Sequence, residues 1–149
     1  VEVEFLIGFA QEVLSKCSAL DQKNREPILF NMSNLLSVLS PDSGIELINL
    51  VHSYMKPGDI LSITNLDQKH FESGPGFIVI LDQDEQGLKE VHKNQGKFYK
   101  TVVDLPNFKE QMKKSGFEVL KSESITRNIT VLGKRSLPGS FITAVFKAV

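Results

Sequence analysis

A strand, a helix, a tight turn and a second strand follow one another within residues 28–64, and this order restricts the fold more than any other feature of the sequence. The apolar run at 28–32 predicts a buried strand, and the run at 59–64 predicts another. Between them, residues 45–55 place apolar side chains at three- and four-residue spacing, which is typical of a helix. So short a connection favours a right-handed crossover between parallel neighbours, and hence an α/β fold.

The sequence also predicts where this helix begins and ends. Asp42 or Ser43 offers the side-chain oxygen that a helix start requires. Lys56 places a cation in the last turn, and Pro57 and Gly58 then stop the helix. The pattern therefore predicts a sharp turn directly into the second strand.

The remaining elements follow from the same patterns, and we treat residues 1–149 as a single domain. Residues 66–104 are predicted to hold a β-hairpin insertion, because two turn signals separate their apolar runs. The final strands are expected to be antiparallel neighbours joined by a linker at 133–139. The other predicted elements are helices at 5–17 and 107–115 and strands at 77–81, 97–103, 117–123, 128–132 and 141–149.

Composition sets the class of protein. A chain of 149 residues with 41% hydrophobic side chains and a mean hydropathy of −0.08 has enough apolar surface for one globular core. Its longest apolar stretch, 77–81, is too short to cross a bilayer, and no secretory leader pattern opens the sequence. Cys17 is the single cysteine, which suits a reducing compartment. We expect a cytoplasmic protein that does not enter a membrane.

The charges are divided unevenly along the chain. Residues 1–88 carry 5 basic and 13 acidic side chains, a net −8, whereas residues 89–149 carry 12 and 5, a net +7. The segment from Lys89 to Arg135 alone holds 11 of the 17 basic residues. This segment is a candidate surface for an acidic partner; the alternative is that the two halves neutralise each other once the chain folds.

Four stretches in order resemble the carboxyl-terminal part of a class I S-adenosylmethionine-dependent methyltransferase. They are a strand and its following loop at 28–39, a Lys-Pro-Gly turn into a strand at 50–61, a helix ending in Gly-Phe at 108–119, and a last strand at 141–149. The resemblance implies a Rossmann-like sheet, mostly parallel with an antiparallel carboxyl-terminal hairpin. It also implies S-adenosylmethionine as cofactor and a small-molecule or macromolecular methyl acceptor.

One motif of that family is missing. Methyltransferases of this class hold the methionine end of the cofactor on a Gly-x-Gly-x-Gly turn after their first strand, where only glycine permits the close approach, and this sequence contains no such element. The sheet is therefore expected to be incomplete at its amino-terminal side. Three explanations fit: a truncated enzyme, a degenerate relative without catalysis, or a likeness of layer architecture alone.

The resemblance assigns roles to a few residues. Glu2 or Glu4, near the end of a strand, would hold the ribose of the cofactor, and Asn31 and Met32 would complete that cofactor site. The substrate contacts would come from three residues that follow the carboxyl ends of the two predicted parallel strands, namely Ser33, Asn34 and His70.

A structural alternative stands beside each of these roles. The run 31–34 is also typical of a strand-to-loop turn, and His70 also fits a structural histidine. No pattern assigns a catalytic group, a metal site or an oligomeric state. The favoured function is methyl transfer by a truncated chain, and the alternative is a non-catalytic methyltransferase-like binding module with a basic carboxyl-terminal half.

Overall fold

The computed structural model describes residues 12, 14–15, 25–70, 77–80, 87–93, 98–131 and 135–149. Most of the predicted helix at 5–17 lies outside these ranges, although Glu12, Leu14 and Ser15 are helical. The elements in chain order are β1 (Leu29–Ser33), the 3-10 helix η1 (Leu36–Val38), α2 (Pro41–Tyr54), β2 (Ile60–Leu66), β3 (Phe77–Ile80), β4 (Leu88–Lys93), β5 (Phe98–Val103), α3 (Leu105–Lys114), β6 (Phe117–Val131) and β7 (Arg135–Ala148).

The larger sheet has the order β1-β2-β7-β6. β1 and β2 pair in parallel, with Leu29 opposite Ile60 and Ser33 opposite Thr64, which confirms the crossover predicted around α2. β7 pairs antiparallel with both β2 and β6, which confirms the carboxyl-terminal hairpin. The described part of the sheet is thus mixed, with one parallel and two antiparallel pairs.

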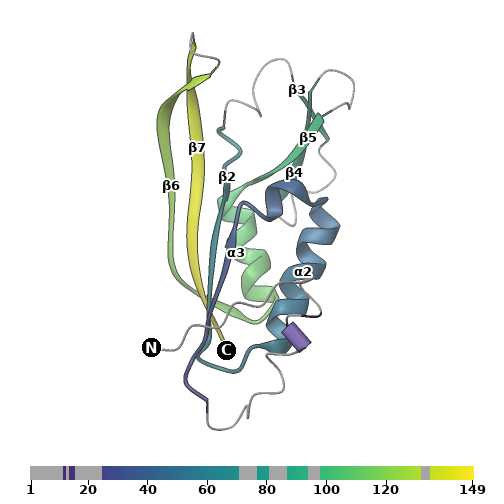
Figure 1. The fold of residues 1–149 in the computed structure, drawn as a ribbon, viewed down its shortest axis with the longest axis vertical. Helices are drawn as coiled ribbons and strands as arrows, with labels where there is room; N and C mark the ends of the chain where they lie inside the picture. Colours follow the sequence, from purple (N-terminus) through teal and green to yellow (C-terminus); the bar gives the residue numbers. More distant parts are fainter. Residues whose placement is uncertain are drawn as a thin grey trace.

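Both long helices, α2 and α3, lie on the same side of this sheet (Figure 1). Along β2 and β7, alternate side chains point to that side and are fully buried, whereas their neighbours are half-buried. This alternation is the period-two pattern of a strand with one covered face. The core residues on these two strands are Leu61, Ile63, Ile142, Ala144 and Phe146. Within the described residues, no helix is long and apolar enough to span a bilayer.

A second, three-stranded antiparallel sheet has the order β3-β4-β5. It lies within the interval 66–104, for which the sequence predicts a hairpin insertion, and β4 adds a strand between the two that the sequence indicates. β5 extends from this sheet toward the carboxyl end of β2 (Figure 1), where Asp67 forms an isolated bridge with Val103. The second sheet therefore reaches the edge at which the parallel strands end.

The start of α2 differs from the sequence prediction. The N-cap is Ser40, whose hydroxyl oxygen accepts a hydrogen bond from the Ser43 N–H at 3.3 Å, and Pro41 occupies the first helical position. Asp42 and Ser43, which the sequence favours as the start, already lie within the helix. Proline suits this place because it has no N–H to leave unsatisfied and its φ is already helical.

The two last strands are longer than the sequence predicts. β6 continues without a break from Phe117 to Val131, with a bulge between Val119 and Lys121, instead of dividing in two. β7 already begins at Arg135, so that Pro138 lies inside it, opposite Asn128. A proline has no N–H to donate to a neighbouring strand. It is tolerated at position 138 because β2 pairs with β7 only from Phe141 onward, so the part of β7 that holds Pro138 does not have to donate an N–H to β2.

An ion pair joins the amino-terminal ends of β1 and β2. The Arg25 guanidinium binds both carboxylate oxygens of Asp59, one at 2.8 Å, and the Asp59 side chain is fully buried. The same carboxylate accepts the N–H groups of Ile28 at 2.9 Å and Lys56 at 2.8 Å. Burial would raise the pKa of Asp59, but the Arg25 guanidinium and these N–H donors together lower it to about 2.

Acid should therefore weaken the fold through Asp59. A carboxyl whose folded pKa is about 2, against 3.8 when unperturbed, contributes about 2 kcal/mol at neutral pH, all of it present above pH ~4 and lost as pH falls toward 2. We expect Asp59→Asn to lower the free energy of unfolding at pH 6 by at least this amount and to flatten its decline between pH 4 and 2. Urea denaturation across that range measures it. Glu46→Gln, on the exposed side of α2, is the matched control and should leave the pH profile unchanged.

Gly87, the turn residue just before β4, should tolerate no side chain. Its φ is +72°, and an added Cβ would lie 2.0 Å from the backbone nitrogen of Phe108. Gly58 has a φ of +99° but open space around it, so Gly58→Ala tests backbone strain alone, at about 1 kcal/mol. We expect Gly87→Ala to lower the thermal midpoint much further than Gly58→Ala, as measured by circular dichroism. Equal losses would show that the packing of Gly87 against α3 is unimportant.

Candidate functional site

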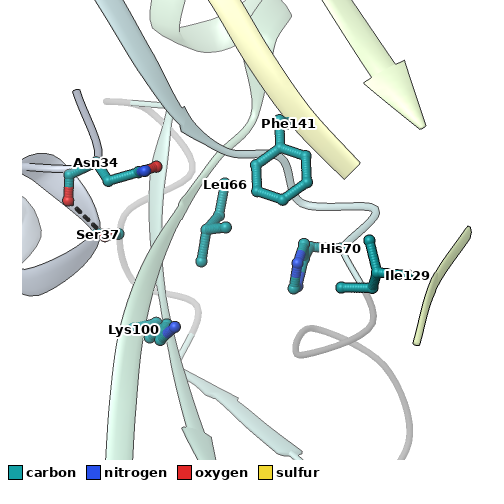
Figure 2. A pocket seen from close by; sticks show the side chains of 7 residues that line it. All are labelled: Asn34, Ser37, Leu66, His70, Lys100, Ile129 and Phe141. Carbon is teal, nitrogen blue, oxygen red and sulfur yellow. Dashed lines mark hydrogen bonds between the residues drawn. The ribbon is translucent and has the colours of Figure 1, made fainter. Parts of the chain in front are cut away.

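A pocket of about 360 Å³ opens where β1 and β2 end. Figure 2 shows the side chains around it, which come from the loop after β1, the end of β2 and the turn beyond it, β5, β6 and β7. The carboxyl ends of parallel strands are the usual ligand edge of an open α/β sheet. The lining residues are Asn34, Ser37, Leu66, His70, Lys100, Ile129 and Phe141.

The loop after β1 is fixed by short hydrogen bonds. Asn34 adopts a left-handed conformation, with φ at +56°, which asparagine tolerates better than most residues. Its N–H donates to the Thr64 carbonyl at 2.7 Å, and its own carbonyl accepts the Ser37 hydroxyl at 2.6 Å. The chain therefore turns sharply at Asn34 and places Asn34 and Ser37 together at one wall of the pocket.

β5 ties this loop to β2. The buried Thr101 donates its hydroxyl to the Leu39 carbonyl at 2.5 Å and accepts the Asn65 side-chain amide at its own carbonyl at 3.1 Å. Thr101 and Asn65 are both fully buried. Hydrogen bonds between buried groups hold a loop firmly, because breaking one leaves a polar atom without water or partner.

β5 and β7 also hold the turn after β2. The N–H of Asp67 donates to the Ser140 carbonyl at 3.0 Å, and that of Gln68 donates to the Val103 carbonyl at 2.9 Å. The Asp67 carboxylate accepts the Lys69 N–H at 2.9 Å and the hydroxyl of Ser124. This turn ends at His70, whose side chain is 4% exposed and meets Phe141 edge to face with ring centroids 5.3 Å apart.

The hairpin of β6 and β7 provides the apolar wall. Phe141 pairs with Leu66 across the β2–β7 ladder and lies on the same face of the sheet. Ile129 lies over Gly139, where an added Cβ would come within 3.0 Å of it. The absence of a side chain at Gly139 therefore lets Ile129 lie across β7 toward the pocket.

Solved structures show which known proteins share this fold. A S-adenosylmethionine-dependent methyltransferase of Methanosarcina mazei matches 89% of this chain and 64% of its own with a TM-score of 0.53 at 14% identity. One from Anabaena variabilis matches 91% and 55% with a TM-score of 0.52 at 10% identity. A Pyrococcus horikoshii protein matches 99% and 60% with a TM-score of 0.50 at 16% identity.

This chain has the class I methyltransferase fold. The resemblance noted in the sequence is thereby confirmed at the level of the fold, and the chain spans less than two thirds of the length of each of these three structures. No protein-family model matches the sequence, and no curated protein sequence does so.

The methyltransferase fold brings two of the predicted site residues together. Asn34 and His70, taken from the ends of different strands, line the same pocket. Asn31 and Ser33 lie on the exposed side of β1, where their side chains bond each other at 3.2 Å. Met32, between them, is buried in the core, so its side chain faces the helices. Glu2 and Glu4 lie outside the described residues.

Five of the seven lining residues are not among the site residues that the sequence predicts. The sequence gives a weak indication of a site role for Ser37, because it closely follows the polar run 31–34. Leu66, Ile129 and Phe141 have no such indication, because their sequence pattern is that of ordinary strand residues. Lys100 belongs to a series of lysines that also suggests a basic strip, together with Lys89, Lys93 and Lys97. Lys89 instead binds Gln68 at 3.1 Å and Asp104 at 3.5 Å, so Lys89 and Lys100 have different surroundings.

The part of the chain that the structure describes contains no group of three His, Cys, Asp or Glu side chains arranged to hold a metal. The polar side chains that line the pocket carry amide, hydroxyl, imidazole and ammonium groups. These groups suit hydrogen bonding and charge recognition of a ligand.

Thr101 should be needed to hold the loop that carries Asn34 and Ser37. Thr101→Val keeps the shape but leaves the Leu39 carbonyl without its donor, which should cost about 1–2 kcal/mol in the free energy of unfolding. The backbone amides of η1 should then exchange with solvent faster, as hydrogen exchange measures. Thr143→Val, the same change at a half-buried β7 position with no side-chain hydrogen bond to another described residue, is the control. Similar exchange in both variants would contradict the role of Thr101.

Proposed function

We propose that this chain takes part in S-adenosylmethionine-dependent methyl transfer and that the methyl acceptor binds in the pocket at the ends of β1 and β2. The observation that carries the proposal is the position of this pocket, at the ligand edge of a methyltransferase fold and between Asn34 and His70. Fold alone does not define a reaction, so the proposal depends on the site. The single cysteine favours a cytoplasmic location.

The described residues include groups that could bind the acceptor. The Asn34 amide is exposed and bonds no other described side chain, so it is available to orient the acceptor by hydrogen bonding. His70, held by its turn and by Phe141, presents an imidazole to the same space. Ser33, one residue before Asn34, extends the polar edge. Methyl transfer is a displacement that depends mostly on such positioning.

The residues for the cofactor are only partly present. S-adenosylmethionine, when bound, supplies an electrophilic methyl group on a sulfonium. The exposed Asn31 and the backbone of Met32 offer polar groups at the end of β1, and Glu2 and Glu4 are proposed to hold the ribose. The sequence has no Gly-x-Gly-x-Gly turn for the methionine end. The described residues therefore fit the acceptor side of such a site better than its cofactor side, and a truncated enzyme accounts for the difference.

A second function is favoured by that same missing turn. A methyltransferase-like scaffold without catalysis needs no cofactor loop, and its basic segment from Lys89 to Arg135 would bind an acidic partner. On α3 two lysines of this segment, Lys113 and Lys114, are exposed. Such binding would weaken steeply with salt, because exposed charges are screened.

Calorimetry with S-adenosylmethionine separates the two functions. We expect micromolar binding, either by these 149 residues or by the chain extended upstream along its reading frame to include a strand and a glycine-rich turn. In the version that binds, Asn31→Ala should weaken the affinity several-fold, because one hydrogen-bonding group contributes about 1 kcal/mol. Asn49→Ala, at an exposed position of α2, should leave the affinity unchanged. If neither version produces heat with the cofactor, the methyl-transfer proposal is wrong and the scaffold function stands.

A further inference from the structure

β1 lies at one edge of the larger sheet. The sheet order is β1-β2-β7-β6, so within the described residues no strand lies beyond β1. The Ile28 carbonyl accepts the Ile60 N–H at 2.9 Å, and the Asn34 N–H donates to the Thr64 carbonyl at 2.7 Å. Alternate residues of a parallel strand bond the neighbouring strand. The even-numbered residues of β1 therefore bond β2, and the N–H and C=O groups of the odd-numbered residues point outward.

The outward groups belong to Leu29, Asn31 and Ser33. All three residues are exposed, and on that side their backbone groups bond no other described residue. Pro27 before the strand and the left-handed turn at Asn34 after it limit the row to these three residues. Such a row of N–H and C=O groups is a template for a further strand.

The two edges of the sheet differ in how they treat a further strand. β6, at the opposite edge, has a bulge between Val119 and Lys121 and carries the charged residues Glu118, Lys121, Glu123 and Arg127. Bulges and charges both hinder edge pairing. No charged residue occurs between Pro27 and Pro41, and the apolar side chain of Leu29 is 64% exposed. The chemistry of β1 thus favours pairing, whereas that of β6 opposes it.

A second copy of this chain fits the β1 edge by symmetry. Two copies related by a two-fold axis pair their β1 strands antiparallel, with Asn31 opposite its own copy and Leu29 opposite the partner's Ser33. Every residue so opposed has outward N–H and C=O groups, so each pair exchanges both hydrogen bonds. The strand carries no charge, and the net charge of −1 leaves little repulsion between whole chains.

We propose that two copies of this chain associate through β1, which joins their larger sheets into one continuous sheet. The contact is small, because each copy contributes one short strand to it, so we expect micromolar association rather than a permanent dimer. This association requires neither the pocket nor S-adenosylmethionine, so its absence would leave the proposed methyl transfer unaffected.

Amide hydrogen exchange, followed by NMR, tests the edge residue by residue. When the concentration of the 149-residue chain rises from about 20 µM to about 500 µM, the amides of Leu29, Asn31 and Ser33 should exchange at least about tenfold more slowly, because the partner strand accepts them. The amides of Phe30 and Met32 face β2 and should not change, so they are the internal control. Sedimentation velocity should show a dimer over the same range. A monomer at every concentration, or a dimer whose three outward amides stay fast, overturns the inference.

Two sets of variants test the pairing and its register. Asn31→Pro removes an outward N–H and no bond to β2, so it should abolish the dimer. Leu29→Lys with Ser33→Lys sets like charges opposite each other and should associate about tenfold more weakly than Leu29→Lys with Ser33→Glu, which sets opposite charges there. Glu46→Lys, at an exposed position of α2, is the control and should dimerise normally. Circular dichroism checks that each variant is folded. Undiminished dimerisation of Asn31→Pro, or equal association of the two charged pairs, overturns the inference.

Discussion

The hydrogen bonds between β5 and the loops beyond β1 and β2 determine where the pocket lies. A sheet holds its strands in register, but it does not position the segments that continue past their carboxyl ends. Here Thr101 holds the first loop through Leu39, and the Val103 carbonyl holds the second turn through Gln68. These contacts involve buried groups, each of which would cost about 1–3 kcal/mol if left unsatisfied. The second sheet, which the larger one does not need for its own pairing, is therefore what brings Asn34 and His70 to one site.

The same pair of parallel strands is joined differently at its other end. Asp59 receives two bonds from Arg25 and two from backbone N–H groups, at the side of the sheet where the strands begin. A buried carboxylate with four donors is well satisfied, and removing any partner would leave charge buried without compensation. Stability thus depends on groups at the amino-terminal ends, while ligand chemistry depends on groups at the carboxyl ends. A change at one end need not alter the other.

The sequence predicts what is local and leaves out what depends on distant pairing. The crossover of β1, α2 and β2 follows from periodicity and from the turn at Pro57 and Gly58. The parallel pairing places Asn34 and His70 at the same edge of the sheet, but the contacts with β5 that hold them at one pocket have no local signal. Phe141 and Ile142 are adjacent and both apolar, yet one lines the pocket and the other is buried among the helices. Which face each takes depends on the register between β2 and β7, and a register formed across 76 residues, from Leu66 to Phe141, has no local signal.

In the folded chain, part of the positive charge of the basic half is paired within that half. Several cations of the basic half bind acids of that same half: Lys89 contacts Asp104, Lys113 contacts Glu110, and Lys147 contacts Glu118. Exposed pairs of this kind add little stability, but each brings an acid beside a lysine and so lowers the local positive potential. Lys100 lies at the pocket, which is also lined by amide, imidazole and apolar side chains. The segment from Lys89 to Arg135 therefore does not act as one uniformly basic face, because the neighbours of each cation decide how much of its charge a partner would meet.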